Sequence, residues 1–441
     1  MTGSAAGGNR QARTTAAWAR RLFSGPFAWF TLGVLAMVAA ASARSLIHHP
    51  PQEARSGELV ILSGADESTG GQRQLLVDKW NLAHPDTPAR LEKLSRSADE
   101  QHSEMVARAQ SDNPNVDVYN LDVTWTAEFA TAGYIRPLDD SVDTSGFLDA
   151  PLKTCQFDGK LWALPFNTDA GLLFYRKRVP PDALPATLPP RQNDVRALRD
   201  AEPTLQAGFV TPLAAYEGLT VSALEAIWAA QGDVYDAEKD LVVIDSEQAH
   251  AGLQRLAEAM KPVGDLPPAV DPRSNDFRED TSRAAFQRGE VPLMRNWPVA
   301  YGQLRTGDRP MTDFDVTPLP GRSVLGGQNL AVATSTRNPR VAQELVTFLT
   351  SEESERALFR NGGLAATRAT VYDDPQVRLV RPYAPTLRQA LSKARPRPVT
   401  PHYALFSSTF QEIVTEALSN GGNLPDDAVK RLTDALHGRV S

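Results

Sequence analysis

Short apolar runs alternate along the chain with stretches in which apolar residues recur every three or four positions. Such runs predict strands, and the three-to-four spacing predicts amphipathic helices. The predicted strands lie at 58–63, 91–94, 116–121, 291–294 and 326–332. The predicted helices follow Gly70 and lie at 100–111, 221–231, 246–260, 280–289, 339–350, 410–418 and 426–436. This alternating order predicts an α/β fold.

The predicted fold is organised around residues 157–179, FDGKLWALPFNTDAGLLFYRKRV. Two apolar runs flank the polar residues Asn167, Thr168 and Asp169, which predicts two strands joined by a polar crossing. Such a crossing can present an amide and a carboxylate to a ligand, or it can be an ordinary surface turn. The proline-rich stretch 180–203 predicts an irregular surface excursion, and 316–320 predicts a second crossing.

The length of 441 residues predicts two lobes, because a single core of that size is unusual. The net charge of -7 argues against a nucleic-acid partner, because no basic face stands out that could neutralise phosphates. The one cysteine, Cys155, excludes an internal disulfide and a cysteine-based zinc site. The seven histidines have no metal-ligand spacing and no nucleophile elbow is present, so we expect no metal and no cofactor.

The N-terminus has the pattern of a targeting segment. A basic region, 1–25, precedes an apolar segment, 26–47, and a polar linker, 48–57. The arginines should remain in the cytoplasm, so the rest of the chain is expected on the extracellular face of the membrane. Arg20–Arg21 fits a twin-arginine signal cleaved after Ala43, and an uncleaved anchor helix fits equally well. No lipoprotein anchor is expected, since no cysteine lies nearby.

Three side chains stand where ligands meet α/β sheets. Glu67 lies in the loop between the first strand and its helix, and Asp122 follows the strand 116–121. Carboxylates at the carboxyl ends of strands face the crevice in which ligands bind. Trp297 follows the strand 291–294 and is either a stacking platform or a core residue.

Five segments in order carry a resemblance to the extracellular solute-binding proteins, family 1, of sugar ABC transporters, the trehalose/maltose-binding type. They are VDVYNLDVTWTAEFATAGYIRPLDD, GKLWALPFNTDAGLLFYRK, AFQRGEVPLMRNWPVAY, GGQNLAV and RPVTPHYALFSSTFQEIVTEAL. The resemblance extends from about Glu58 to the C-terminus. It implies a two-lobed periplasmic-binding-protein clamshell of type II, which closes on a carbohydrate and hands it to an ABC permease.

The resemblance also implies lobes and site residues. The first lobe would comprise 58–165 and 318–345, and the second 166–317 and 346–441. A monomer is expected, and a membrane contact only through an uncleaved N-terminal segment. The implied ligand-binding residues are Glu67, Asp122, Asn167, Asp169, Trp297, Gly327, Gln328 and Arg397. Of these, Glu67 and Asp122 would belong to the first lobe, and Asp169, Trp297 and Arg397 to the second.

Three positions depart from the family pattern. Asn167, Val299 and Gln328 stand where members of this type often carry aromatic residues. Loss of these platforms favours a smaller or more polar sugar, or a cleft without a ligand. A membrane-anchored sensor or scaffold without a transport role is therefore a second hypothesis. A glycosidase that uses the carboxylates is a third, because such enzymes need two carboxyl groups at a defined separation.

Overall fold

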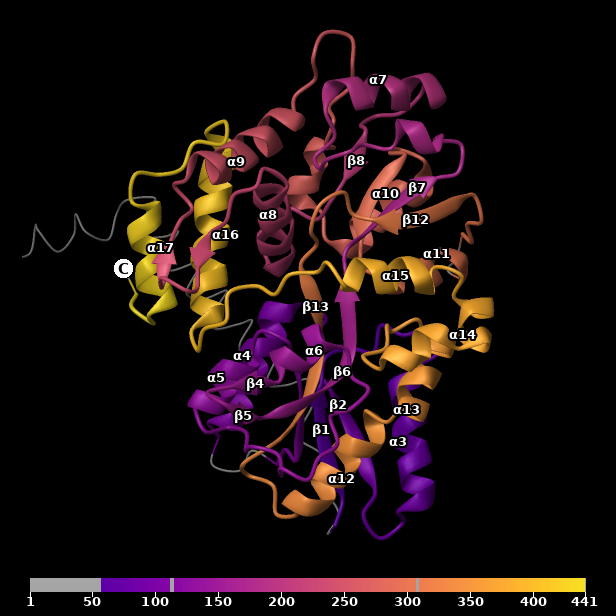
Figure 1. Ribbon diagram of the computed structural model, residues 1–441, viewed down its shortest axis with the longest axis vertical. Helices are drawn as coiled ribbons and strands as arrows, with labels where there is room; N and C mark the ends of the chain where they lie inside the picture. Colours follow the sequence, from indigo (N-terminus) through magenta and orange to yellow (C-terminus); the bar gives the residue numbers. More distant parts are fainter. Residues whose placement is uncertain (1–56, 112–114, 307–308, 441) are drawn as a thin grey trace, which may run out of the picture. The chain divides into compact units, whose positions relative to one another are not determined.

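The computed structural model describes residues 57–111, 115–306 and 309–440. Within this part of the chain two sheets, each with its own helices, form two lobes (Figure 1). The predicted basic region, signal or anchor segment and most of the linker lie outside the described residues. Among the described residues, no helix is both long and apolar enough to cross a membrane.

The first-lobe sheet has the strand order β2-β1-β3-β13-β6. Its strands are β1 Leu59–Ser63, β2 Ala89–Lys93, β3 Val118–Asp122, β6 Ala163–Ala170 and β13 Leu325–Val332. The first three are parallel, whereas β13 runs antiparallel to both β3 and β6. All five residues of β1 are buried, as expected for a strand covered on both faces.

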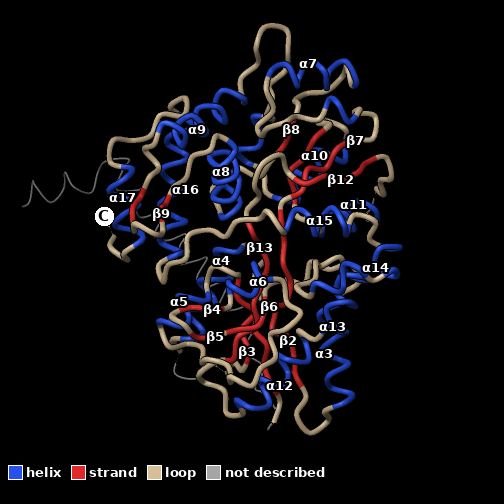
Figure 2. Tube along the Cα trace, in the orientation of Figure 1, coloured by secondary structure: helices blue, strands red, loops and turns tan. Residues whose placement is uncertain are grey.

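The second-lobe sheet has the order β12-β7-β11-β8. Its strands are β7 Leu172–Arg176, β8 Phe209–Val210, β11 Leu293–Asn296 and β12 Phe314–Pro318. Two-residue strands form separate ribbons, β4 Gln156–Phe157 with β5 Lys160–Leu161 and β9 Tyr235–Asp236 with β10 Leu241–Val242. Figure 2 shows the two groups of strands, with helices around each.

Helices cover both sheets. Those of the first lobe are α3 Gln72–Ala83, α4 Ala98–Ala109, α5 Thr126–Thr131, α6 Asp149–Thr154, α12 Pro339–Leu349, α13 Glu352–Ala357 and the π-helix η3 Leu358–Gly362. Those of the second lobe are η1 Pro181–Ala183, α7 Gln192–Ala201, α8 Glu217–Ala229, α9 Glu247–Ala259, η2 Pro272–Asp276, α10 Glu279–Arg288, α11 Val299–Thr306, α15 Ala384–Leu391, α16 Tyr403–Ser419 and α17 Ala428–Leu436. The helices η4 Ala369–Asp373 and α14 Pro375–Val380 connect the two sets.

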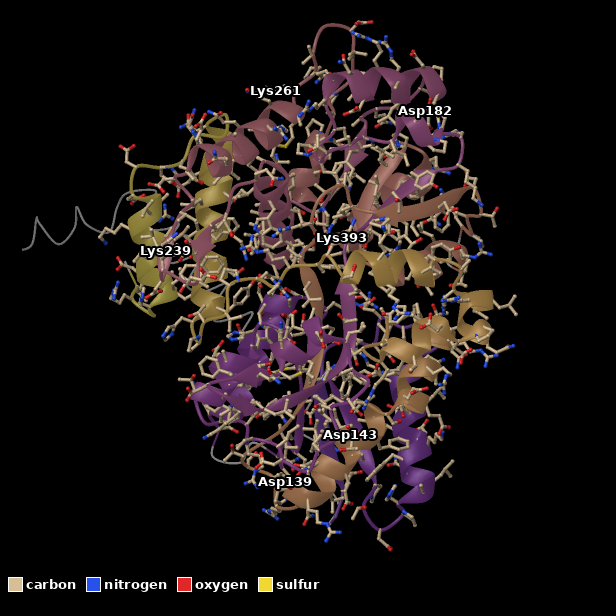
Figure 3. All side chains as sticks on the ribbon, viewed as in Figure 1. Asp139, Asp143, Asp182, Lys239, Lys261 and Lys393 are labelled. Atoms are coloured by element: carbon tan, nitrogen blue, oxygen red, sulfur yellow. The ribbon has the colours of Figure 1, made fainter. Side chains whose placement is uncertain are left out.

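Three passages join the lobes. The first is Gly171, between β6 and β7, and the second lies between β12 and β13. The third follows η3, because α14 packs against η3 whereas α15 packs against β12. Exposed charged side chains cover the outer surfaces, for example Asp139 on the first lobe and Asp182 and Lys261 on the second (Figure 3).

Some lobe boundaries differ from those expected from the sequence. Leu349, Leu358 and Leu364 are buried in the same core as β1 and α3, so the first lobe continues beyond residue 345. The residues 166–170, expected in the second lobe, belong to β6 of the first-lobe sheet. The residues 316–318, expected to cross, are part of β12, and the passage follows them.

Two local predictions were also wrong. The stretch 180–203 contains the helix α7, whose Val195 and Leu198 are buried and at whose start the backbone N–H of Arg191 donates to Asp194 Oδ2 at 2.7 Å. The surface-turn alternative for Asn167–Asp169 is excluded, because both Asn167 and Thr168 are buried in β6.

Cys155, the one cysteine, is fully buried, and this burial raises the pKa of its thiol well above the ordinary value.

Candidate functional site

Strand register brings three of the predicted residues into one row across the first-lobe sheet. Gln328 of β13 lies opposite Asp122 of β3 on one side and opposite Asn167 of β6 on the other. Asp169 lies two residues beyond Asn167, on the same face of the strand. The row ends where β6 leaves the first lobe, so these side chains lie at the junction between the lobes.

Two glycines of β13 make room at this junction. Gly327 has a φ of 127°, and a side chain there would overlap the carbonyl oxygen of Asn167. A Cβ on Gly326 would lie 3.2 Å from the six-membered ring of Trp297. The pair Gly326–Gly327 therefore lets an indole from the second lobe approach the first-lobe sheet. At Gly327, one of the predicted residues, the backbone conformation and the close approach of Asn167 therefore require glycine.

Asn167 and Asp169 lie in a weakly solvated environment. Asn167 is 3% exposed, and its Oδ1 accepts no hydrogen bond from any described residue. Burial raises the pKa of Asp169 to about 7, although the positive charges of Arg73 and Arg295 oppose this effect. The carboxyl group therefore changes charge near neutral pH.

Gln328 is held by a buried arginine. Arg73, in the first turn of α3, donates from Nη2 to Gln328 Oε1 and from Nη1 to Ser63 Oγ at 3.3 Å. Asn120 donates to the same Gln328 oxygen at 3.2 Å. Gln328 is therefore engaged within the first lobe, where the family pattern has an aromatic platform.

Trp297 lies at the end of β11 and rests on a buried ion pair. The guanidinium carbon of Arg295 lies 3.9 Å from the centre of the indole ring. Arg295 in turn makes two hydrogen bonds to Glu225, at 2.9 and 2.8 Å. The indole Nε1 donates to Glu279 at 3.3 Å. These contacts fix the orientation of a half-buried ring that extends toward Gly326.

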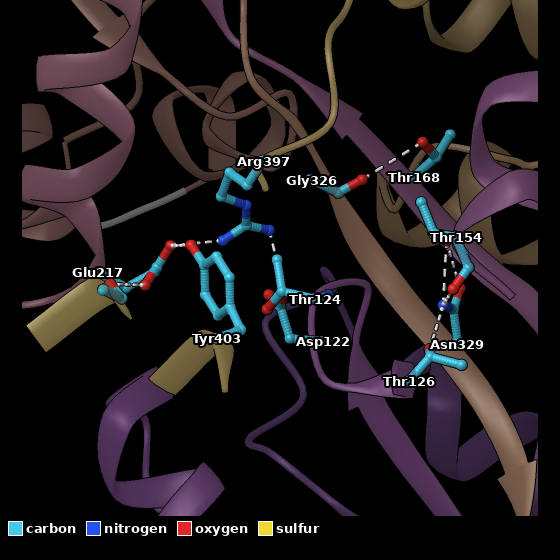
Figure 4. A network of polar contacts seen from close by, with 11 residues as sticks. Asp122, Thr124, Thr126, Thr154, Thr168, Glu217, Gly326, Asn329, Arg397 and Tyr403 are labelled. Atoms are coloured by element: carbon cyan, nitrogen blue, oxygen red, sulfur yellow. Dashed lines mark hydrogen bonds and ion pairs between the residues drawn. The ribbon is translucent and has the colours of Figure 1, made fainter. Parts of the chain in front are cut away.

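Arg397 connects the two lobes directly (Figure 4). It donates from Nη2 to Asp122 of the first lobe at 2.9 Å and from Nη1 to Glu217 of the second at 2.6 Å. Burial would lower the pKa of Arg397, but the negative charges of Asp122 and Glu217 outweigh it and raise the pKa. One guanidinium thus neutralises carboxylates from both lobes.

Glu217 is the centre of a further set of contacts. Tyr403 and Ser407, both on α16, donate to its carboxylate at 2.5 and 2.6 Å. Burial raises the pKa of Glu217, and Arg397 opposes this effect. The start of α8 and one face of α16 are therefore joined to Arg397 through a single carboxylate.

A cavity of about 220 Å³ lies beside this network. Its first-lobe wall is formed by α4 and the start of α5, and its second-lobe wall by Glu217 and α16. The lining residues are Ala98, Asp99, His102, Ser103, Asp122, Thr124, Trp125, Glu217, Tyr403, Ala404, Ser407, Ser408 and Gln411. The cavity is thus lined by both lobes and is rich in oxygen atoms.

Glu67 lies at another point of the junction. It is within 3.6 Å of Arg96, and Gln303 of the second lobe donates to it at 3.5 Å. Of the predicted residues, Asp122 and Arg397 are therefore in direct contact. A second group lies around the adjacent strands β6 and β13 and comprises Asn167, Asp169, Gly327, Gln328 and Trp297. Glu67 belongs to neither group.

The other half of these contacts comes from residues that are not among those predicted from the sequence, namely Glu217, Tyr403, Arg73 and Asp99. Tyr403 lies within a motif that was recognised, and Glu217 begins a helix predicted to start four residues later, so a search for acidic residues at helix starts would have found it. From the sequence, Arg73 resembles an ordinary solvent-exposed charged residue of a helix.

Among the described residues, no group of three or more His, Cys, Asp or Glu is placed to hold a metal ion.

Comparison with known proteins identifies the family. A family model of the bacterial extracellular solute-binding proteins matches residues 77–379, more than half of the chain. A probable ABC transporter-binding protein of Deinococcus radiodurans is 28% identical over 343 residues, which are 73% of this chain and 79% of that protein.

Solved structures agree with this match. The maltose-bound structure of MalE3 from T. maritima has 29% sequence identity and a TM-score of 0.75, with 86% of this chain and 99% of that chain covered. The GacH receptor of Streptomyces glaucescens, solved unliganded and with acarbose, has 20% identity and a TM-score of 0.69 over 86% and 99% of the two chains, which shows a shared fold.

The predicted two-lobed fold and the predicted family are both confirmed. The family consists of exported binding proteins rather than enzymes. The chain belongs to the bacterial extracellular solute-binding proteins.

Proposed function

We propose that this protein captures a carbohydrate between its lobes and delivers it to an ABC permease. The observation that supports this most directly is the junction at Arg397, where one buried guanidinium meets a carboxylate from each lobe beside a 220 Å³ cavity. Carboxylates accept hydrogen bonds from vicinal hydroxyl groups, and a guanidinium donates in a planar fork. A hydroxyl-rich ligand could satisfy both kinds of group.

The proposed site continues from the cavity to the row of predicted residues. Trp297, supported by Arg295, offers an indole for the apolar face of a sugar ring. Asp169, Asn167 and Gln328 would provide polar contacts, and Glu67 would approach from the loop before α3. The maltose bound to the T. maritima relative supports a sugar ligand, although Gln328 is engaged by Arg73 and offers no stacking surface.

Calorimetric titration with a panel of mono- and disaccharides tests the proposal. We expect heat of binding for at least one carbohydrate and an increase in melting temperature on its addition, because a ligand that binds the folded state stabilises it. A folded protein that binds no member of the panel would contradict the proposal. Identification of a molecule that copurifies with the protein would name the ligand.

The remaining expectations are proposals with separate tests. We propose that the chain does not hydrolyse its ligand, so purified protein should release no phenol from aryl glycosides. We propose that it is a monomer, which sedimentation measures. We also propose that residues 26–47 direct export or anchor the chain, which the N-terminal sequence of the mature protein and its fractionation between membrane and medium distinguish.

A further inference from the structure

The cavity between the lobes carries an excess of hydrogen-bond acceptors. Three of its lining residues are carboxylates, Asp99, Asp122 and Glu217, and neither lysine nor arginine is among the described residues that line it. Asp122 accepts three hydrogen bonds, two from Thr124 and one from Arg397, all on Oδ1. Its Oδ2 accepts none from the described part of the chain.

A buried amide adds a second free acceptor. Gln411 of α16 is only 9% exposed and lines the cavity. It donates from Nε2 to Ser407 at 3.1 Å, and its Oε1 accepts no hydrogen bond from any residue that the structure describes. A group that completes these contacts must donate hydrogen bonds.

The charges around the cavity are not balanced. Arg397 alone is shared by Asp122 and Glu217. Asp99 has Arg278 nearby, and His102 is hydrogen-bonded to Glu128 at 2.7 Å. Burial raises the pKa of both Asp99 and Glu217; the positive charges of Arg278 and His102 oppose this at Asp99 and that of Arg397 at Glu217, and the negative charge of Asp122 raises each pKa further. A positive charge inside the cavity would relieve this repulsion.

The walls also suit a compact organic cation. Trp125 and Tyr403 provide aromatic surface, which attracts cations, and Ser103, Thr124 and Ser408 provide hydroxyl groups. A volume of 220 Å³ is below the usual range of about 300–1,000 Å³ for ligand pockets. The cavity therefore suits a ligand of about one sugar ring.

We propose that this cavity selects a sugar that carries a protonated amine, with the ammonium group at Asp99, Asp122 and Gln411. An ammonium group has three donors and no acceptor, which complements a wall of free acceptors. The inference rests on the proposed carbohydrate-binding function and specifies the chemical class of the ligand.

Titration with three related sugars tests the inference. Glucosamine, N-acetylglucosamine and glucose share a ring and differ in whether a charged amine is present. At about pH 6.5, where an amine of ordinary pKa is mostly protonated, we expect glucosamine to bind at least about 10-fold more tightly than either neutral sugar. Its affinity should fall as sodium chloride is raised, because salt screens charge–charge attraction. Equal affinities for the three sugars would overturn the inference.

Paired variants locate the charge. Asp99→Asn should weaken glucosamine binding about 10-fold and reduce its salt dependence, because the isosteric amide removes one negative charge. Asp182→Asn, at an exposed position of the second lobe (Figure 3), is the matched control and should bind as the unmodified protein does. Circular dichroism confirms that each variant is folded. Equal affinity of the two folded variants for glucosamine would overturn the inference.

The outcome also separates this inference from the proposed function. Binding of neutral sugars without preference for glucosamine would overturn the amine selectivity and leave carbohydrate binding intact. A folded protein that binds no carbohydrate in the wider panel would overturn both.

Discussion

Two of the arginine–glutamate ion pairs near the lobe junction differ in where their partners lie. Arg295 and Glu225 both belong to the second lobe, are nearly inaccessible to solvent and support Trp297. Arg397 contacts a carboxylate from each lobe, beside a cavity. The first pair can be lost only at the expense of the fold, whereas the contact between Arg397 and Asp122 can separate when the lobes move apart. The same chemistry thus serves architecture in one place and lobe closure in the other.

Replacement Glu225→Gln should produce the largest loss of stability. It leaves the guanidinium of Arg295 buried without its counter-charge, which typically costs about 3–5 kcal/mol of unfolding free energy. Chemical denaturation measures the loss. The double variant Glu225→Leu with Arg295→Met should recover most of the stability, because no charge then remains buried. A loss below about 1 kcal/mol in the single variant would show that the pair is not structural.

Arg397→Met should instead affect ligand binding. The two carboxylates it leaves can regain water when the lobes separate, so we expect a smaller loss of unfolding free energy than for Glu225→Gln. Ligand affinity should fall by about 30-fold or more, as for truncation of a buried charge at an interface. Small-angle scattering should show a larger radius of gyration for the unliganded variant. Equal stability losses in the two variants would remove the distinction between the pairs.

Trp297→Ala tests whether the platform above Arg295 serves the ligand. We expect about a 10-fold loss of affinity for the sugar, because the aromatic face is removed. The ring is half-buried, so the loss of unfolding free energy should stay below the roughly 3–5 kcal/mol of a core aromatic residue. A loss within that range, with affinity unchanged, would identify Trp297 as a core residue.

A pH dependence of stability is also expected at Asp169. Burial raises its pKa to about 7, from an ordinary value near 4, so the folded state favours the protonated form. Its contribution to stability is complete below about pH 4 and is lost progressively as the pH rises toward about 7. Asp169→Asn should therefore lose less stability than the unmodified protein between pH 5 and pH 8 in denaturant titrations. Identical slopes would contradict this assignment.

The sequence predicted those features that depend on local patterns. The strand before Trp297 and the helices α10, α12 and α17 follow from apolar spacing and were placed within a few residues. The helix α7 was missed because neighbouring prolines obscured the spacing of Val195 and Leu198. Prolines outside a helix do not prevent one from forming between them.

Partners that are distant in sequence were beyond such reasoning. Glu217 and Arg397 are separated by 180 positions, and Arg73 and Gln328 by 255. Only the fold shows that these pairs meet. The prediction that Asp169 belongs to the second lobe was wrong for a related reason. The eight residues of β6 continue the first-lobe sheet up to Gly171, and no local sequence signal shows which sheet a strand joins.

The enclosed position of Cys155 has a practical consequence. Its thiol is inaccessible and its burial disfavours the reactive thiolate, so maleimide dyes should leave it unmodified. A cysteine introduced at Ser408, an exposed position on the wall of the cavity, would then be the preferred site of labelling. An environment-sensitive fluorophore there would turn the protein into an optical sensor for its own ligand, without removal of any native residue beyond the labelled one.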